Sequence, residues 1–508
     1  MAFEVRQEIN GTVYVYRTEG YWDKQKKQCR HHRVCIGKVD TKTGEIIPSR
    51  SQIHPRGCLD YGNYYVLKSI AQQTGLLDAL KEVFPDFWHE IITCAFYEIS
   101  ERKPLYLCEQ WSESTRTVNS VVLSSQRISE LLQSLGEADK ERMAFFSKWA
   151  QVRSEREYLA FDITSISSYS KLIETLEYGY NKDGEDLPQV NMGMLFGQTS
   201  LLPVFYTLYP GSIRDMSTLK NMINYAKHIN SQKIRFVMDK GFYSDNNIRE
   251  MQENGVKFAI SVPFTTEISR SLAAKAKQHI CSPIKSFVIS GDVVYSETKK
   301  IPKNGKKLRA FIYFNERQLL DAKESLLKRI ARVEQILKDK RSVSAARNDT
   351  ALAFLKIRKG KNGLSIRRDE EKIKKALKHK GFNIIVSNEY RDAQDVLYLY
   401  RSKDSIEKTF DNMKNELDMK RLRIHSDSAM TGRTFVCFIS LILYAWLDKC
   451  MKEKDLYKTY TQEEVLCELK KLKIVELSPG KKILTEMTKT QKMLLNAFDI
   501  PEPTETLL

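Results

Sequence analysis

The stretch EYLAFDITSIS, residues 157–167, decides the fold of this chain. Before it, from residue 61 to about residue 150, apolar residues recur at the three- and four-residue intervals of helices. In this stretch the period changes to that of a β-strand, and the strand is expected to end in a carboxylate, Asp162. Residues 190–209 predict two more strands joined by a short turn. The sequence therefore changes here from helices to a sheet.

A second acid lies at the end of another predicted strand. Residues 233–255, KIRFVMDKGFYSDNNIREMQENG, predict a strand that ends in Asp239, then a glycine turn and a helix. Residues 257–263 predict one further strand. This order of strands and helices predicts a mixed α/β fold. Two acids would then lie at or near the carboxyl ends of strands, where α/β folds place their functional sites.

A third acid lies on a predicted amphipathic helix, YRSKDSIEKTFDNMKNELDMKRLRIHSD, residues 400–427. At 100° per residue, one narrow apolar stripe contains Ile406, Phe410, Met413 and Leu417. A second stripe along its border, within about 60° by the same geometry, contains Tyr400, Lys403, Glu407 and Lys414. Glu407 is therefore expected beside the buried face of the helix, flanked by two lysines and a tyrosine.

The periodicity of apolar residues along the rest of the chain predicts six regions. We expect an N-terminal β-rich region, a helical region that binds DNA, a core in two parts, an insertion of strands and basic helices between those parts, and a helical C-terminal region. Helical units with glycine-containing turns are common both as DNA-binding modules and as scaffolding. The N-terminal β-rich region is expected at residues 1–60 and the helical DNA-binding region at 61–154. The two core parts are expected at 155–263 and 391–450, the insertion between them at 264–390, and the C-terminal region at 451–508.

Composition and charge narrow the class of partner. The chain has 508 residues, with 82 Lys and Arg against 64 Asp and Glu, and its formal net charge is +18. Such a balance favours an anionic partner, either nucleic acid or an anionic membrane. The longest apolar run, residues 435–447, is too short to span a bilayer, so we expect nucleic acid and no membrane. A polar N-terminus and nine scattered cysteines favour a reducing, cytoplasmic setting.

One group of cysteines and histidines is a candidate zinc site. The stretch CRHHRVC contains Cys29, His31, His32 and Cys35. The flanking pattern predicts the strands of a hairpin, and no second ligand pair follows at zinc-site spacing. We therefore expect a structural role for these residues, without a metal.

The three acids have the chemistry of a metal site. Asp162, Asp239 and Glu407 offer the hard oxygen ligands that Mg²⁺ and Mn²⁺ prefer. Two such ions about 4 Å apart can activate a water or hydroxyl group and stabilise the leaving oxygen of a phosphodiester. Lys403 and Lys414 would then meet the phosphates of DNA.

Each acid also has an ordinary structural interpretation. Lys403 and Glu407 form an i,i+4 pair, which is worth about 0.2–0.5 kcal/mol on an exposed helix. Asp162 and Asp239 are equally suited to turns or helix caps. Taken singly, such acids are more often structural than catalytic. Their order along the chain is what favours a site.

Taken together, these residues resemble the bacterial insertion-sequence DDE transposases with a ribonuclease H-like core, in the branch that carries a tyrosine–arginine–glutamate–lysine signature. The spacing of that signature is Tyr, two residues, Arg, three residues, Glu, six residues, Lys. Here it is matched by Tyr400, Lys403, Glu407 and Lys414, with lysine at the arginine position.

Four further blocks carry the same resemblance. FDITSIS (161–167) and MDKGFYS (238–244) resemble the strands of the first and second aspartates. YGYNKDG (178–184) resembles the family's Gly-Tyr-Ser-Lys-Asp turn, and LYPGSIRDMSTL (208–219) resembles its Pro-Gly-Asn-x-x-Asp segment, with Ser212 in place of asparagine.

The resemblance implies a DNA transposase of an insertion sequence, a transposable element bounded by inverted repeats. Such an enzyme binds those repeats as double-stranded DNA, cuts at them and joins them to target DNA, working as a homodimer in the bacterial cytoplasm at the nucleoid. It also implies that Asp162, Asp239 and Glu407 hold two Mg²⁺ (or Mn²⁺) ions. Tyr400, Lys403 and Lys414 would position the terminal phosphate and any hairpin or flipped base.

Two alternatives stay open on the sequence. One is a transposase-derived protein that binds DNA without cutting it, and the other is a metal-dependent nuclease of the same fold. Lys403 keeps the charge of the family's arginine but lacks its bidentate fork. Strand cleavage is therefore the firmer expectation, and a hairpin intermediate is the weaker one.

Overall fold

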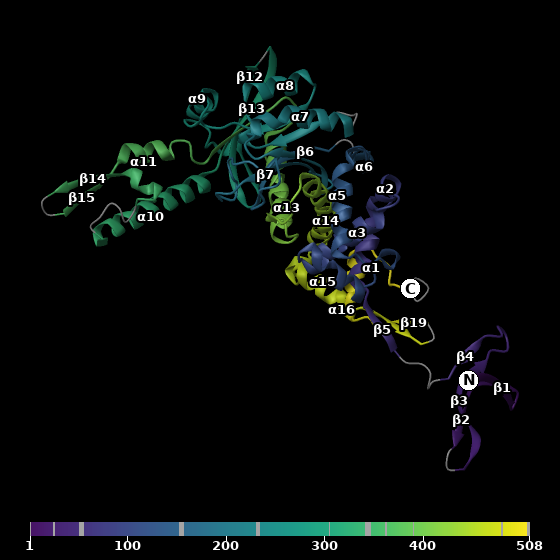
Figure 1. Ribbon diagram of the computed structural model, residues 1–508. Coiled ribbons are helices and arrows are strands. Elements are labelled where there is room, and N and C mark those ends of the chain that lie inside the picture. Colours follow the sequence, from purple (N-terminus) through teal and green to yellow (C-terminus); the bar gives the residue numbers. More distant parts are fainter. Residues whose placement is uncertain are drawn as a thin grey trace. The chain divides into compact units, whose positions relative to one another are not determined.

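The computed structural model describes residues 2–23, 26–49, 55–151, 157–229, 234–303, 305–340, 347–360, 363–389, 391–478 and 481–504. The chain divides into two compact units, coloured by sequence in Figure 1. The first unit comprises Met1–Ala138, Glu416–Asp418 and Ser428–Leu508. The second comprises Asp139–Asn415 and Met419–Asp427.

A ten-stranded mixed sheet forms the centre of the second unit, so the predicted mixed α/β fold is confirmed. Its strand order is β11-β12-β13-β16-β10-β9-β6-β7-β8, with the short β17 paired to β6. β6, β7 and β8 are antiparallel neighbours, whereas β9 runs parallel to β6, and β10 runs parallel to β9. The bounds of these strands are β6 Leu159–Ser168, β7 Gln189–Gly197, β8 Pro203–Pro210, β9 Arg235–Met238, β10 Lys257–Ser261 and β17 Arg421–Leu422.

Helices pack against this sheet and bury its central strands. Every residue of β7 is buried, as expected of a strand in the middle of a covered sheet. α13 packs against β6, α6 against β8, and α12 against β9 and β10. The helices of this region are α6 Asp139–Gln151, α7 Asp215–Ile229, α8 Asp245–Glu253, α12 Ala393–Ser402 and α13 Asp404–Asn415.

The strands of the predicted insertion extend the same sheet. β16 pairs antiparallel with β10 on one side and with β13 on the other, and β12 and β11 follow outward. The bounds are β11 Ser286–Ile289, β12 Asp292–Lys303, β13 Lys306–Phe314 and β16 Phe382–Ser387. Helix α9, Glu267–Ala276, packs against β13 and β16.

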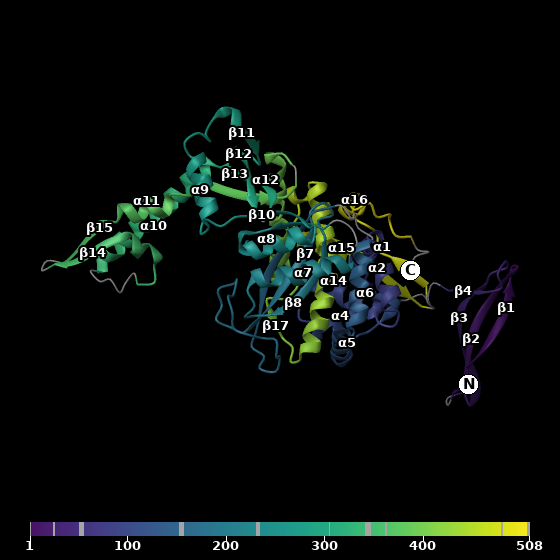
Figure 2. The ribbon, with the colours of Figure 1, turned by 90° about the horizontal axis from the view of Figure 1, so that it is seen from above.

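The basic helices of the insertion, α10 and α11, lie together with β14 and β15 (Figure 2) and have a hydrophobic cluster of their own. Its buried members are Ile330, Val333, Leu337, Ala351 and Leu355. They come from α10 Glu316–Lys340, the 3-10 helix η7 Thr350–Phe354 and β14 Leu355–Gly360, beside β15 Gly363–Arg368 and α11 Glu370–Leu377. The segment between β13 and β16 thus has a local core, and its folding as a separate subdomain stays a prediction.

The first unit is largely helical, and a buried ion pair joins two of its helices. Arg433 of α14 pairs with Glu98 of α3, whose carboxylate also accepts a 2.6 Å hydrogen bond from Ser440. The apolar run 435–447 lies in α14, which is long and apolar enough to cross a membrane. However, 78% of its most apolar window is buried inside the protein, as in a core helix. The helices are α1 Gly62–Gln73, α2 Leu76–Val83, α3 Trp88–Glu101, α4 Cys108–Ser114, α5 Ser125–Glu137, α14 Asp427–Glu453, α15 Gln462–Lys470 and α16 Lys489–Ala497.

Two small sheets complete the first unit. β1 Ala2–Ile9, β2 Thr12–Asp23, β3 Gln28–Val39 and β4 Ile46–Pro48 form an antiparallel sheet in that order. β5 Pro55–Asp60 instead pairs with β18 Lys473–Leu477, which pairs with β19 Lys481–Leu484. The C-terminal region, expected to be helical, therefore also contributes two strands, of which β18 pairs with β5 and β19 pairs with β18.

Candidate active site

Asp162 and Asp239 lie at the same level of two neighbouring strands. Phe161 of β6 pairs in parallel with Met238 of β9, and each aspartate is the next residue along its strand. Asp239 comes directly after the end of β9 and precedes the 3-10 helix η4, Lys240–Phe242. Because parallel strands keep paired residues level, this register sets the two aspartates side by side on neighbouring strands.

The expectation that the first strand ends at Asp162 was wrong. β6 continues to Ser168 because its other neighbour, β7, pairs with it as far as Ser167. What ends near Asp162 is the pairing with β9, and β17 pairs with β6 further along, at Ser167 and Ser168. Asp162 therefore lies where the pairing with β9 stops, inside a continuing strand.

The carboxylate of Asp162 is mostly buried and partly neutralised. Its Oδ1 accepts a 2.8 Å hydrogen bond from the Ile163 N–H and lies 3.4 Å from Nζ of Lys182. Burial raises the pKa of Asp162 above its usual range, although Lys182 and the Ile163 N–H oppose the rise. Glu407 contributes to the rise in that pKa, so its charge acts on Asp162.

The carboxylate of Asp239 is held by a tyrosine. The hydroxyl group of Tyr400 donates a 2.7 Å hydrogen bond to Oδ1 of Asp239. Burial alone would raise the pKa of Asp239, but hydrogen bonds from Tyr400 and the Lys240 N–H, with the nearby charge of Lys403, hold that pKa below its usual range. Burial and the charge of Asp239 raise the pKa of Tyr400, which keeps its hydroxyl group protonated as a donor.

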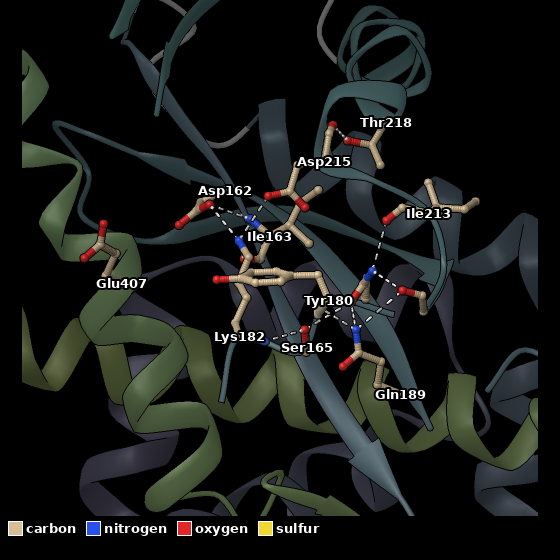
Figure 3. A network of polar contacts seen from close by, with 12 residues as sticks. Asp162, Ile163, Ser165, Tyr180, Lys182, Gln189, Ile213, Asp215, Thr218 and Glu407 are labelled. Atoms are coloured by element: carbon tan, nitrogen blue, oxygen red, sulfur yellow. Dashed lines mark hydrogen bonds and ion pairs between the residues drawn. The ribbon is translucent and has the colours of Figure 1, made fainter. Parts of the chain in front are cut away.

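The third acid lies on a helix that differs from the predicted one. Residues 400–427 do not form a single helix, because α12 ends at Ser402, α13 spans Asp404–Asn415, and β17 follows. The predicted apolar stripe is confirmed, with all four members buried: Ile406, Phe410, Met413 and Leu417. This stripe anchors α13 so that Glu407 projects from its other side, beside the strand that carries Asp162 (Figure 3).

Lys403, at the break between α12 and α13, pairs with Glu407, and the charges of Asp162 and Asp239 also act on it. Its side chain is only 7% exposed, and its Nζ is 2.5 Å from Oε1 of Glu407. Burial alone would lower the pKa of this ammonium group, but the bond to Glu407 and the charges of Asp239 and Asp162 hold that pKa above its usual value. One buried cation is thus stabilised by three carboxylates from three different elements.

The three acids are oxygen ligands of the kind that bind Mg²⁺ or Mn²⁺, and metal binding by them stays a prediction. Among the described residues, no group of three His, Cys, Asp or Glu side chains is arranged to hold a metal as it stands. The described residues include the candidate zinc residues on β3, where His31 and His32 are consecutive and point to opposite faces of their strand. Around Lys403, however, three carboxylates already favour a positive charge, and oxygen ligands of this kind suit Mg²⁺ or Mn²⁺.

Lys414 is paired with an acid of the 178–184 turn. Its side chain is 8% exposed, and its Nζ lies 2.8 and 2.7 Å from the two carboxylate oxygens of Asp183. The contact joins α13 to the turn that follows β6. Contact of Lys414 with DNA phosphates stays a prediction, as do the DNA contacts of Tyr400 and Lys403.

Lys182 lies beside Asp162 and also contacts Asp215, and the sequence alone assigned no role to either residue. Nζ of Lys182 donates to the carbonyl oxygen of Ile163 and lies 3.4 Å from both Asp162 Oδ1 and Asp215 Oδ2 (Figure 3). Lys182 belongs to the YGYNKDG block and Asp215 to the LYPGSIRDMSTL block. The resemblance of those two blocks to the family is the sequence pattern that could have identified Lys182 and Asp215. Only the fold shows that the two blocks meet at the first aspartate.

Comparison with known proteins identifies the family. The profile of the transposase DDE domain family matches residues 153–443, which is more than half of the chain. No curated protein sequence matches it. Among solved structures, it is similar to a piggyBac transposase in a synaptic complex with hairpin DNA, at 10% identity and a TM-score of 0.36, over 80% of this chain and 70% of that one. On the family match, the chain belongs to the transposase DDE domain family.

Proposed function

We propose that this protein is the transposase of an insertion sequence, of the branch with the Tyr-Arg-Glu-Lys signature. In this proposal it binds the terminal inverted repeats of its element and catalyses metal-dependent cleavage and strand transfer. The observation that carries the proposal has two parts: the register of β6 and β9 sets Asp162 and Asp239 level with each other, and the buried Lys403, which pairs with Glu407, is stabilised by the charges of both aspartates. Three acids from distant parts of the chain thus act on one buried cation.

The topology of the sheet supports a ribonuclease H-like core. In the order β8-β7-β6-β9-β10, three antiparallel strands are followed by two strands parallel to β6. The first acid lies on the central strand β6, and the second follows its parallel neighbour β9. The third acid comes from a helix that packs against β6, after a long insertion. This is the order in which the resemblance predicts the three acids.

The chain's own residues would divide the chemistry among them. Asp162, Asp239 and Glu407 would hold divalent metal, which supplies activation of the attacking water or hydroxyl group and stabilisation of the leaving oxygen. Tyr400 orients Asp239 through its hydroxyl group. Lys403 balances the acids and would bind the terminal phosphate of the DNA as a point charge, without the bidentate grip of arginine.

The charge of the chain supports double-stranded DNA as the partner. A net charge of +18 provides the electrostatic attraction on which non-specific DNA binding rests. In this proposal the helical region 61–154 also contacts the DNA. Cutting two ends in concert would require at least two copies of the chain, so we propose a homodimer in the synaptic complex, working in the bacterial cytoplasm.

Cleavage of the element's own ends tests the proposal. The purified protein would be incubated with Mg²⁺ or Mn²⁺ and a fragment carrying the inverted repeats that bound its reading frame, with a scrambled-end fragment as the control. We expect nicking at the repeat boundary, followed by joining to a target plasmid. End binding without nicking would instead support a DNA-binding protein that does not cut. Cleavage without end preference or joining would support a metal-dependent nuclease.

A denaturing gel of the cleaved ends tests the route of cleavage. A hairpin intermediate gives a covalently closed end that migrates as a strand of doubled length. Since Lys403 replaces the family's arginine, the hairpin is a separate proposal from strand cleavage, and open ends would exclude it while leaving the transposase assignment intact.

A further inference from the structure

The region between Asp162 and the start of α7 contains a lysine shared by two acids. Nζ of Lys182 is 3.4 Å from Oδ1 of Asp162 and 3.4 Å from Oδ2 of Asp215. The side chains of Lys182, Asp162 and Asp215 are 28%, 15% and 30% exposed, so all three are shielded from bulk water to a similar degree. A cation at equal distance from two carboxylates can move toward either one without leaving the site.

Buried polar side chains fix the position of this lysine. Ser165 and Asn191 are directly paired on β6 and β7 and are almost completely buried. The hydroxyl group of Ser165 accepts a hydrogen bond from the Lys182 N–H, at 3.3 Å. The hydroxyl group of Ser167, also buried, accepts one from Asn181, at 3.0 Å. The sheet therefore holds the backbone of the turn that carries Lys182, as Figure 3 shows.

The same polar layer fixes the segment that carries Asp215. Asn191 donates to the carbonyl oxygens of Gly211 and Ile213, at 3.1 and 3.2 Å. The two segments meet through glycines, since a Cβ atom on Gly179 would lie 1.9 Å from the Gly211 carbonyl oxygen. Burying polar side chains is costly unless they are hydrogen-bonded. This layer satisfies them by holding Lys182 and Asp215 at Asp162.

Asp215 also lies close to the turn after the second aspartate. A Cβ atom built on Gly241 would be 3.7 Å from Oδ2 of Asp215, the same oxygen that pairs with Lys182. Gly241 is two residues after Asp239. The Lys182–Asp215 pair is thus in contact with the segments of both aspartates.

We infer that Lys182 and Asp215 are positioning residues of the metal site, with Lys182 as the counter-ion of Asp162 before a metal binds and Asp215 as the acceptor of Lys182 afterwards. This inference rests on the proposed function. A metal at Asp162 must displace the neighbouring ammonium group, because two cations in contact repel each other. Asp215 provides the displaced ammonium group with an anionic partner within the same site.

The inference predicts opposite effects of two substitutions on metal affinity. Lys182→Met removes the competing cation, so Mn²⁺ should bind more tightly, by roughly three- to tenfold. Asp215→Asn removes the alternative partner, so Lys182 stays on Asp162 and Mn²⁺ should bind more weakly, by a similar factor. In the double variant the affinity should match that of Lys182→Met, since Asp215 acts only through Lys182. A purely structural role would weaken binding in both single variants.

Calorimetric titration of the DNA-free full chain with Mn²⁺ tests this inference without relying on catalysis. Lys220→Met is the matched control, because it removes the same charge from an exposed position of α7, the helix that Asp215 begins. Circular dichroism would verify folding. If Lys182→Met does not fold, Lys182→Gln, which can still donate to the Ile163 carbonyl oxygen, should shift the affinity in the same direction.

The possible results separate this inference from the proposed function. Opposite shifts in the two single variants, with the double variant matching Lys182→Met, support the inference. Unchanged affinities, or shifts of the same sign in both single variants, overturn the inference. If the wild type still binds Mn²⁺ in that case, the proposed metal site is not affected. If Glu407→Gln binds Mn²⁺ as well as the wild type does, or neither binds it, the proposed metal site fails and the inference fails with it.

Discussion

The ammonium group of Lys403 lies 2.5 Å from the carboxylate of Glu407, at a position where the charges of Asp162 and Asp239 also act on it. By spacing alone this is an ordinary i,i+4 pair of a helix. In the structure the lysine is buried at the break between α12 and α13, and the charges of Asp162 and Asp239 add to that of Glu407 in stabilising its ammonium group. The lysine therefore holds a charge that a metal would otherwise supply.

Replacing Lys403 should make the fold depend on divalent metal. In Lys403→Met, three carboxylates remain without their shared cation and repel each other. We expect a lower melting temperature without metal, and a larger rise in that temperature on adding Mg²⁺ than in the wild type. Lys403→Arg, which keeps the charge, is the control. Equal stabilisation of both proteins by Mg²⁺ would show that Lys403 does not substitute for a metal.

Tyr400→Phe should impair cleavage more than DNA binding. The substitution removes only the hydroxyl group that holds Asp239, and a hydrogen bond to a charged group is worth about 1.5–3 kcal/mol. We therefore expect the cleavage rate to fall by about tenfold or more, with little change in affinity for the DNA ends in a gel-shift titration. Unchanged cleavage together with weakened end binding would instead make Tyr400 a DNA contact.

The Lys414–Asp183 pair should stabilise the fold. Lys414 is buried and Asp183 is partly exposed, so removing the ammonium group leaves a partly buried acid without its partner. Lys414→Met should lower the free energy of unfolding in urea by about 2 kcal/mol. Adding Asp183→Asn should then cost little more, which a double-mutant cycle measures as coupling. Additive costs would mean that the two residues do not depend on each other.

DNA binding gives a second measure of Lys414. If it also meets a phosphate, Lys414→Ala should weaken end binding and reduce the slope of log affinity against log salt by less than about one contact. An unchanged slope would show that Lys414 does not contact a phosphate and acts only through its pair with Asp183.

Glu297 of β12 should make the stability of the sheet depend on acid pH. Its carboxylate lies 2.7 Å from Nε2 of His279, 3.2 Å from Nζ of Lys285 and 2.6 Å from Nζ of Lys299. Burial opposes the charged form, but these three partners lower the pKa of Glu297 from 4.5 to about 2. The pKa of Glu297 is lower in the folded state than in the unfolded state. The ion pairs of Glu297 therefore stabilise the fold fully above pH 4.5, and this stabilisation is lost as the pH falls toward 2.

Urea unfolding at several pH values would measure this effect. The free-energy difference between the wild type and Glu297→Gln should be largest at pH 7 and should shrink between pH 4.5 and 3. Asp321→Asn, at an exposed position of α10, is the control and should show no such trend. A constant difference across that range would contradict the assigned pKa.

The sequence predicted the parts of the site that depend on local periodicity. Strand patterns located Asp162 and Asp239, and a helical stripe located Glu407 beside buried residues such as Phe410. The break at Lys403 was not predictable, because lysine is a good helix former and the break serves long-range contacts with acids. The pairing of β18 with β5 was missed for the same reason, since those strands lie some four hundred residues apart in the chain.

The contacts of Lys182 and Asp215 also depended on the fold. Lys182 lies in a turn and Asp215 begins α7, and the sequence predicts no particular orientation for either side chain. What orients them is a layer of buried polar side chains on β6 and β7, including Ser165 and Asn191. A buried serine or asparagine in a strand looks unfavourable until its partners are known. The sequence alone does not identify them.

Glu407→Gln gives the most direct test of the central claim, that three acids form a metal-dependent cleavage site. The variant and the wild type would be compared for nicking of a fragment with the inverted repeats and for binding to it. Asp411→Asn, which removes an exposed acid one turn along α13, is the matched control. We predict that Glu407→Gln abolishes nicking and leaves end binding nearly intact, because phosphate contacts dominate affinity. Nicking at the wild-type rate would contradict the claim and remove Glu407 from the site.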